Sequence, residues 1–506
     1  MEVKTFTADD LFNWLTAKED FLLLDVRNEV EFGRFKVEGP YPFEMVNVPY
    51  MEFIEMEDES VAKVPRGNKV RIVCAKEGSS KFVGEILVQH GFEDVAHMKV
   101  GIKAWGNLLE PVLVGAGDGY ELYQFRRPGK ASCSYGLISG KEMMVFDPAK
   151  NIPFYLDFAR DKGCAIIKTF ETHRQADYIS GSDMLRQTAG AEIVAPEDDF
   201  GPAKFPYTPA RHGERHGFSS GGPEVEIIHT PGHTPGSTCY RLDGKYLITG
   251  DTVFIQSIGR PDLGGMAQDW SRMLYATMTD ILLKLDDDTV ILPGHYMNWD
   301  EANEDLAFAA PMAKIKADNA AIYSIADEKA FFAFIQANMR PQPEEYARIR
   351  EINAGLVEVD EAQQVHRVLH HQDLGRLEAV VAALGQRAIP GDGVGPVGAR
   401  AQRLERLEGL LVVVLLEVLA VGQQVHVEYG HVGVRRRLLH ALHDGVIEGS
   451  QLEVRDREAE RLLRHDVEQA GIDRLGRGQR AETAVGGIDL QVAARDGDAV
   501  LPAGGG

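Results

Sequence analysis

The chain has 506 residues, a formal net charge of −23 and a pI near 5.2. One hydrophobic core rarely serves so long a chain, so two or three domains are expected. Nucleic acids and anionic membranes repel an acidic surface, so the charge argues against both kinds of partner.

Apolar and cysteine patterns favour a cytoplasmic location. The longest apolar run, Leu410–Val421, is shorter than the roughly 20 residues that a membrane-spanning helix needs, and it contains Glu417. The first residues lack the basic and then apolar plan of a signal peptide. The cysteines form no C-x-x-C pair and argue against a disulfide scaffold: Cys74, Cys133, Cys164 and Cys239. The oligomeric state stays open, a homo-oligomer included.

Residues 1–107 alternate short apolar runs with helical stretches. The runs at 21–26 and 70–74 predict buried strands, and 80–90 predicts a helix entered from a glycine-containing loop. This rhythm predicts a small α/β domain with a parallel sheet. Residues 108–119, rich in Gly, Val and Leu, are interpreted as a linker.

Residues 120–364 have paired strands. Two pairs of apolar runs flank Gly140 and Asp243-Gly244 respectively: 134–139 with 143–147, and 237–242 with 245–249. Helices are expected at 154–162 and 182–189, and further helices over 301–364 would close the domain. The pattern predicts stacked mixed sheets flanked by helices.

The composition changes at about residue 365. Residues 365–506 contain no Lys, Asn, Phe, Trp, Met or Cys, and without large aromatic residues a dense core is hard to build. Residues 404–415 could form an apolar helical face, and 425–434 alternate like a strand. Two interpretations stay open: a poorly structured Arg- and Gly-rich extension, or an out-of-frame reading of GC-rich DNA. We assign this tail no function.

Cys74 lies in a loop, Cys-Ala-Lys-Glu-Gly-Ser-Ser, between a predicted strand and a predicted helix. Backbone N–H groups and the positive end of a helix dipole favour an anion there. A thiolate or persulfide on Cys74 would be stabilised, which suits a sulfur carrier. The alternative is a buried structural cysteine.

Five ordered motifs in this region together resemble a single rhodanese domain: Leu24–Phe32, Val37–Gly39, Asn47–Pro49, the Cys74 loop and Gly101–Trp105. The resemblance implies that Cys74 carries the sulfane sulfur. Rhodanese loops usually end in Arg, where this chain has Ser79, and Lys76 is the only nearby substitute. A low-molecular-weight persulfide is therefore a better expected donor than thiosulfate. An inactive, structural rhodanese domain remains the alternative.

A second group of residues has the pattern of a metal site. His173, His233, Asp251 and His295 each follow an apolar, strand-like run, and loops at the ends of neighbouring strands converge. His173 belongs to the loop 172–181, which departs from the metal-binding pattern H-x-H-x-D-H. Its second and last His are replaced by Gln175 and Tyr178, whereas His173 and Asp177 remain.

The segment 120–355 resembles the metallo-β-lactamase superfamily, and within it the persulfide (sulfur) dioxygenases. Its motifs occur in family order: Ser132–Tyr135 with Val145–Pro148, Thr172–Gly181, Thr230–Ser237, Gly250–Thr252, Gly259–Asp262 and Pro293–Tyr296. The Gly-Arg-Pro-Asp element at 259–262 points to the dioxygenases. A rhodanese domain on the same chain agrees, because both activities use a persulfide.

In that family one Fe(II) is held by two His and one carboxylate, with open positions for the persulfide sulfur and O2. By resemblance, Asp251 is the carboxylate and His233 is one imidazole. The third ligand falls on Gln175, a weaker donor, or His173 takes its place. Asp177 and His295 would remain from a second metal site, which argues against a two-zinc hydrolase.

The sequence thus favours an α/β protein with a rhodanese-like domain followed by an αββα metallo-β-lactamase-fold sandwich. The expected activity is oxidation of glutathione persulfide, or a similar thiol persulfide, to sulfite with Fe(II) and O2. Arg260 and Tyr178 are the expected substrate-binding residues, with Arg260 at the anionic end of the carrier. The alternatives are a Zn(II) hydrolase of the glyoxalase II kind and a metal-poor, non-catalytic binding scaffold.

Overall fold

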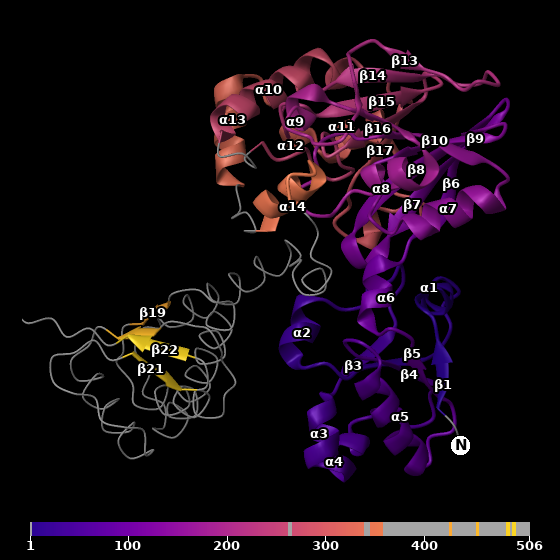
Figure 1. Cartoon of the computed structure of the whole chain (residues 1–506), viewed down its shortest axis with the longest axis vertical. Helices are drawn as coiled ribbons and strands as arrows, with labels where there is room; N and C mark the ends of the chain where they lie inside the picture. The colour runs from indigo at the N-terminus through magenta and orange to yellow at the C-terminus, as the bar shows by residue number, and fades with distance from the viewer. Residues whose placement is uncertain are drawn as a thin grey trace, which may run out of the picture. The chain divides into compact units, whose positions relative to one another are not determined.

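The structure is a computed structural model that describes residues 3–261, 266–338 and 345–357, together with four short strands beyond residue 424. Its contacts divide the chain into two compact units, Met1–Val381 and Ala382–Gly506. Both α/β domains expected from the sequence lie in the first unit (Figure 1).

The first domain is built on a parallel sheet with the order β1-β5-β4-β2-β3. Its strands are β1 (Lys4–Phe6), β2 (Leu22–Asp25), β3 (Glu44–Asn47), β4 (Val70–Val73) and β5 (Val95–Met98). Its helices are α1 (Ala8–Thr16), α2 (Glu29–Arg34), α3 (Tyr50–Glu55), α4 (Glu57–Ala62), α5 (Gly78–Gln89) and α6 (Ile102–Asn107). The strands and the helix predicted from the sequence are present, with bounds shifted by one or two residues.

Helix α1 shows how local sequence sets these elements. Thr7 begins it with a capping box, in which its side chain accepts from the Asp10 N–H at 3.1 Å and its N–H donates to the Asp10 carboxylate at 2.8 Å. Leu11, Phe12 and Leu15 then bury one face of the helix. The Phe12 ring also contacts the Trp299 ring of the second domain at 6.0 Å between centroids.

The second domain contains two sheets. The first has the order β12-β11-β10-β9-β8-β7-β6, and the second runs β13-β14-β15-β16-β17-β18. The first sheet comprises β6 (Glu110–Gly117), β7 (Tyr120–Arg127), β8 (Ser132–Ser139), β9 (Glu142–Phe146), β10 (Ala165–Phe170), β11 (Glu192–Ala195) and β12 (Thr208–Pro209). The second comprises β13 (Arg215–His216), β14 (Val225–His229), β15 (Thr238–Leu242), β16 (Tyr246–Gly250), β17 (Val290–Pro293) and β18 (Ala310–Pro311).

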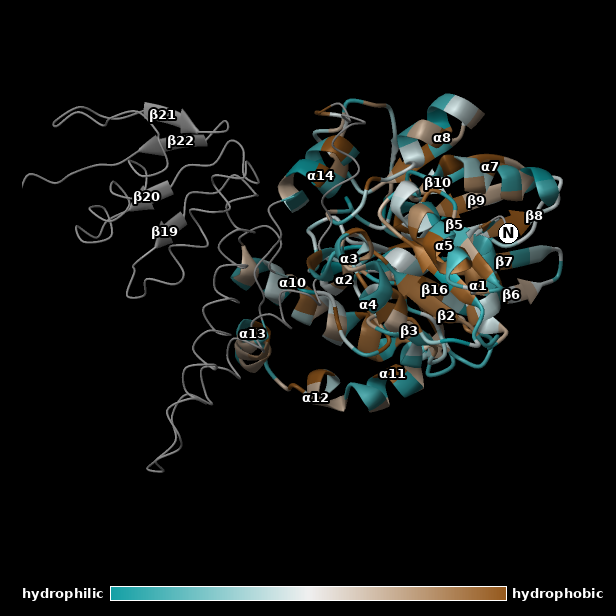
Figure 2. Cartoon of the chain, turned by 90° about the horizontal axis from the view of Figure 1, so that it is seen from below, coloured by the Kyte–Doolittle hydropathy of each residue, from teal (hydrophilic) through white to brown (hydrophobic). Residues whose placement is uncertain are grey.

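Helices cover both sheets. They are α7 (Ile152–Asp161), α8 (Ser182–Ala189), α9 (Glu197–Phe200), α10 (Ala267–Asp280), α11 (Met312–Asp318), α12 (Ala320–Tyr323), α13 (Glu328–Ala337) and α14 (Glu345–Asn353). Strand β9 shows the layering: Met143 and Val145 face the core beneath α7 and α8, whereas Met144 and Phe146 face the core between the sheets. The apolar colour accordingly gathers on central strands such as β16, and α11 is largely hydrophilic (Figure 2). The predicted αββα arrangement is confirmed.

The segment 108–119, interpreted from the sequence as a linker, contains the edge strand β6. This strand pairs antiparallel with β7, with a register shift between Leu113 and Gly115. A Cβ at Gly115 would lie 2.5 Å from the Tyr246 ring. The glycine therefore permits a close approach between chain segments, whereas composition alone suggested a linker.

The Asp243-Gly244 turn confirms a sequence prediction. Both residues have positive φ, 51° and 64°, as a two-residue hairpin turn requires. The turn joins β15 to β16, which pair antiparallel.

The second unit contains four short strands in the order β19-β20-β22-β21. They are β19 (Val425–Val427), β20 (Leu452–Val454), β21 (Glu482–Val485) and β22 (Ile488–Gln491). Strand β19 falls within the strand-like pattern noted at 425–434. The apolar helical face expected at 404–415 lies outside the described residues, as does most of the tail.

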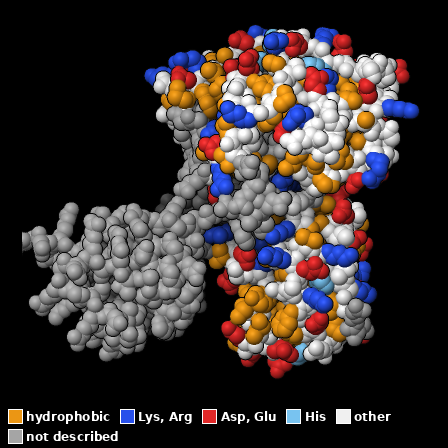
Figure 3. All heavy atoms as spheres, in the orientation of Figure 1, with side chains coloured by type: hydrophobic (Ala, Val, Ile, Leu, Met, Phe, Trp, Pro, Cys, Tyr) orange, Lys and Arg blue, Asp and Glu red, His pale blue; other side chains and the backbone are white. Residues whose placement is uncertain are grey.

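Two surface features of the described residues bear on partners. No described helix has the length and apolar character that crossing a membrane requires. Exposed apolar side chains gather on and directly after α3, namely Tyr50, Met51, Ile54 and Met56. This patch is visible at the lower end of the first domain, within a surface that otherwise mixes acidic and basic groups (Figure 3).

Candidate functional site

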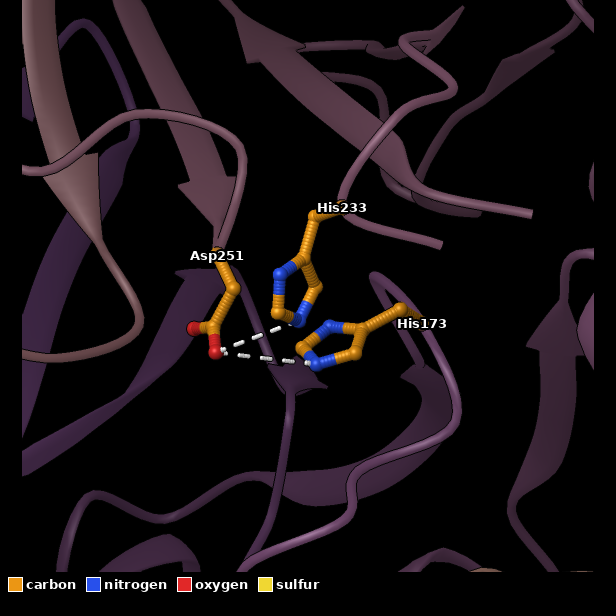
Figure 4. Close-up of side chains that lie close together, drawn as sticks. All are labelled: His173, His233 and Asp251. Atoms are coloured by element: carbon orange, nitrogen blue, oxygen red, sulfur yellow. Dashed lines mark ion pairs between the residues drawn. The ribbon is translucent and has the colours of Figure 1, made fainter. Parts of the chain in front are cut away.

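Three side chains from separate loops converge at one end of the sheets. His173 follows β10, His233 follows β14 and Asp251 directly follows β16. The Asp251 Oδ2 lies 3.8 Å from the His173 Nε2 and 3.6 Å from the His233 Nε2 (Figure 4). Ligand atoms of all three lie within 4.8 Å of one another. Two imidazoles and one carboxylate on one side of a shared point can hold a metal ion and leave positions open.

The His233 ring is held so that one nitrogen stays unused. Its Nδ1–H donates to the Arg260 carbonyl at 3.0 Å. Its Nε2 is buried and has no hydrogen-bond partner among the described residues. A buried polar atom without a partner calls for an explanation, and a cation between His233 and Asp251 would supply one.

The His173 ring has a matching orientation. The Thr172 hydroxyl donates to the Asp147 carboxylate at 2.8 Å, so its oxygen accepts the Nδ1–H of His173 at 2.9 Å. The Nε2 of His173, which faces Asp251, therefore carries a lone pair. The hydrogen bonds beneath the cluster fix both imidazoles in the tautomer that a metal needs.

The charges of the cluster also suit a bound metal ion. Burial lowers the pKa of His233 to about 4, against the attraction of Asp251. Burial raises the pKa of Asp251, but the charge and hydrogen bond of His295 outweigh it and hold that pKa below the usual range. A neutral imidazole beside an ionised carboxylate is the protonation state in which such groups bind metal.

His295 and Asp177 form a different arrangement. The His295 Nδ1 lies 2.8 Å from the Asp251 Oδ1, and its Nε2 lies 2.8 Å from the Asp177 Oδ2. Burial lowers the pKa of His295, but the two carboxylates raise it well above its ordinary value. Both ring nitrogens are thus engaged by carboxylates. The residues expected from a second metal site form a hydrogen-bonded triad with Asp251.

Gln175 lies behind the His173 ring. Its amide nitrogen is 3.4 Å from the His173 Nδ1, the ring nitrogen opposite to the one that faces Asp251. Of the two alternatives that the sequence left for the third ligand, the structure brings His173 to the cluster. Tyr178 is buried, and its hydroxyl donates to the Asp147 carbonyl at 3.3 Å.

Gly250 makes room for this arrangement. Its φ is +48°, and a Cβ there would lie 2.2 Å from the Thr172 Oγ1. The residue before Asp251 must therefore be small for Thr172 to support His173. Thr172 and Asp147 were not singled out as site residues from the sequence, although both lie within the motifs that carried the resemblance.

The Cys74 loop is placed as expected, between β4 and α5. Cys74 is buried, and its thiol donates to the Ser80 hydroxyl at 3.2 Å. Ser80 in turn donates to the Glu77 carbonyl at 2.8 Å. The Ile102 N–H donates to the Cys74 carbonyl at 2.8 Å, which ties the loop to α6. The Lys76 side chain, at the loop's outer turn, is exposed.

A buried ion pair supports the neighbouring strand end. The Arg27 Nη2 lies 2.6 Å from the Asp25 Oδ2, and both side chains are almost fully buried. The Asn47 amide donates to the backbone carbonyls of both residues at 2.8 Å. The Asp-Val-Arg and Asn-Val-Pro motifs thus shape the carboxyl edge of the sheet, where the Cys74 loop lies.

Family comparison assigns the two domains. The description "Rhodanese-like domain" matches residues 7–108, and "Metallo-beta-lactamase superfamily" matches residues 129–295. The chain joins a rhodanese-like domain to a metallo-β-lactamase-fold domain. The converging His173, His233 and Asp251 belong to the second of these domains.

Individual relatives cover parts of the chain. An uncharacterized protein of Mycobacterium leprae (strain TN) is 49% identical over 78 residues, 15% of this chain and 34% of that protein. A hydroxyacylglutathione hydrolase of Rhizobium meliloti (strain 1021) is 30% identical over 141 residues, 28% of this chain and 52% of that protein. The chain thus spans about a third to a half of the length of these curated relatives. Among solved structures, ETHE1 from Myxococcus xanthus aligns with 47% of this chain and 99% of its own, with 23% identity and a TM-score of 0.41.

The backbone of Arg260 has a clear place in the metallo-β-lactamase-fold domain. Its carbonyl orients His233, and its side chain is half-buried. The next residues of the Gly-Arg-Pro-Asp element are described only as far as Pro261, and Asp262 lies outside the described residues. A substrate role for the Arg260 guanidinium, like one for Tyr178, stays a prediction.

Proposed function

We propose that the chain is an Fe(II)-dependent persulfide dioxygenase fused to a sulfurtransferase. The observation that carries the proposal is the convergence of His173, His233 and Asp251, two imidazoles and one carboxylate whose ligand atoms lie within 4.8 Å of one another. This donor set is typical of mononuclear non-haem iron sites that bind O2 and substrate together.

The overall reaction transfers both atoms of O2 to the terminal sulfur of a thiol persulfide. With one water, that sulfur leaves as sulfite, and the carrier leaves as its thiol. A bound Fe(II) would supply the site at which O2 and the persulfide sulfur meet. The chain's own residues hold the imidazole tautomers, through Thr172 and the Arg260 carbonyl, and keep Asp251 ionised through His295.

The His295 triad supports one ion over two. A two-zinc hydrolase needs ligands for both ions, because it divides substrate binding and water activation between them. In this chain Tyr178 stands where the metal-binding pattern has its last His. Both ring nitrogens of His295 form hydrogen bonds, one with Asp177 and one with Asp251. These features favour mononuclear chemistry.

The rhodanese-like domain supports a persulfide substrate. Cys74 lies in the loop that leads into α5, and its thiol contacts Ser80 in the first turn of that helix, where helix N–H groups favour an anionic sulfur. Ser79 occupies the place of the cationic residue that would clamp thiosulfate, so a small thiol persulfide fits this loop better. We propose that Cys74 exchanges sulfur with the thiol pool that the second domain oxidises.

A second candidate is hydrolysis of a glutathione thioester. The relative named hydroxyacylglutathione hydrolase, 30% identical over 141 residues, favours it. A zinc ion at the same three residues would activate water in place of O2.

Metal exchange distinguishes the two candidates. The metal-free full-length chain is loaded anaerobically with Fe(II) or with Zn(II) and then given glutathione persulfide or a glutathione thioester. The proposal expects persulfide-dependent O2 uptake and sulfite from the iron form alone. Thioester hydrolysis by the zinc form, without O2 uptake by the iron form, would establish the hydrolase. A chain that retains neither metal would support a binding scaffold.

A further inference from the structure

Helix α14 holds the loop that carries His173. Asn353, at the end of this helix, is buried, although it lies well beyond the segment 129–295 matched by the metallo-β-lactamase description. Its amide nitrogen donates to the carbonyls of Gln175 and Tyr178, each at 2.9 Å. Its Oδ1 accepts from the Ser180 N–H, also at 2.9 Å. One side chain thus binds three backbone groups of the metal loop.

The loop needs such support because it has no regular secondary structure between β10 and α8. Buried backbone groups outside helices and sheets must find side-chain or solvent partners. The Asn353 amide satisfies two carbonyls and one N–H within six residues, and both of its own N–H groups are used. The loop section that it fixes begins two residues after His173 and contains Asp177.

The helix itself is anchored, so it can transmit this constraint. Tyr346 and Ile349 bury the same side of α14, and Tyr346 packs with Ala176 in the middle of the loop. The residue after Asn353 accepts a hydrogen bond from the Lys204 N–H at 2.9 Å through its carbonyl. Packing and hydrogen bonds therefore hold the helix on both sides of Asn353.

We propose that Asn353 is a positioning residue that sets the metal affinity of the His173, His233 and Asp251 cluster. It acts through the backbone of the loop, to which its three hydrogen bonds are made. The inference rests on the proposed function only in treating this cluster as a metal site. It extends the functional part of the domain to α14.

Two variants of the full-length chain test this role. Asn353→Leu has a similar volume but makes none of the three hydrogen bonds, whereas Ile349→Ala removes packing from the same helix and leaves those bonds intact. Metal-free protein is titrated anaerobically with Fe(II) alone, without persulfide or O2. Asn353→Leu should lower the Fe(II) affinity by about 10- to 100-fold, the range for residues that support metal ligands indirectly. Ile349→Ala should retain the wild-type affinity.

Amide hydrogen exchange on the metal-free chains gives a readout that does not need a metal. The Ser180 amide and its neighbours in the loop should exchange faster in Asn353→Leu than in Ile349→Ala. Equal exchange in the two variants, or wild-type Fe(II) affinity in Asn353→Leu, would overturn the inference. A wild-type chain that binds Fe(II) but consumes no O2 would refute the dioxygenase and leave the role of Asn353 intact.

Discussion

His173 and Gln175 are two residues apart in one loop, and the structure gives them opposite relations to the cluster. The His173 Nε2 faces Asp251, whereas the Gln175 amide contacts the other nitrogen of the same ring. Sequence spacing could not separate them, because the side-chain directions of an irregular loop follow no fixed period. The sequence singled out His233 and Asp251, which follow the recognisable apolar strands β14 and β16.

Substitution of each loop residue should separate these roles. Gln175→Ala should lower the Fe(II) affinity by about 10- to 100-fold at most, because its amide lies next to the ring of His173 and is not itself a ligand. His173→Ala should lose most of the Fe(II) affinity, because one of three ligands is gone. Anaerobic Fe(II) titration of both variants measures the difference. A larger loss of Fe(II) affinity in Gln175→Ala than in His173→Ala would identify Gln175 as the third ligand.

Cys74 should act independently of the metal cluster. Cys74→Ser should abolish sulfur transfer, because a hydroxyl cannot carry the sulfane sulfur, and should leave persulfide-dependent O2 uptake unchanged. Cys164→Ser, at a half-buried cysteine of the other domain, is the matched control and should affect neither activity. Loss of O2 uptake in Cys74→Ser would contradict two separate sites.

At the scale of elements, strand β6 and helix α1 bring ionisable groups together between the two domains. Glu110 begins β6, and burial raises its pKa to about 7, with a further contribution from the nearby charge of Asp9. The positive charge of Arg126 in β7 lowers the pKa of Glu110 in part. The guanidinium of Arg126 lies over the Phe12 ring, 5.3 Å from its centroid. The contact between α1 and the second domain thus buries an acid that is costly to ionise.

This acid predicts a pH dependence of stability. Between about pH 4.5 and pH 7 the folded chain binds more protons at Glu110 than the unfolded chain does. The stability of the folded chain should therefore fall as the pH rises through this window. Above pH 7 the full cost of burying the ionised Glu110 remains. Glu110→Gln should stabilise the protein by roughly 2 kcal/mol at pH 8 and very little near pH 4.5.

Chemical denaturation of the wild type and Glu110→Gln at the two pH values measures this effect. Glu304→Gln, at an exposed residue, is the control and should change stability little at either pH. A stabilisation by Glu110→Gln that is the same at both pH values would show that the charge of Glu110 is not its cause.

Sequence patterns predicted elements well where they depend on local chemistry. The Asp243-Gly244 turn and helix 182–189 follow from turn residues and periodicity, and both are present. Strand β6 was missed because its glycines were taken as the mark of a linker. Gly115 is required by a tertiary contact, the close approach of Tyr246, which composition does not reveal. Asn353 was missed for a similar reason, since its partners lie more than 170 residues away in the sequence.

At the scale of the whole molecule, the chain joins two candidate sites, for which we propose a common persulfide chemistry. The first unit, Met1–Val381, contains the Cys74 loop, the metal cluster and the supporting helix α14. The proposed reactions need nothing from the second unit, Ala382–Gly506. The segments that the family descriptions match, residues 7–108 and 129–295, both lie in the first unit.

The central claim is that His173, His233 and Asp251 hold a single iron. The most direct test is the number of Fe(II) ions bound per full-length chain, measured by anaerobic titration of the metal-free protein with metal analysis. We predict one Fe(II) per chain, because the three proposed ligands form one cluster and both ring nitrogens of His295 contact carboxylates. Two tightly bound ions per chain, or none, would contradict the claim.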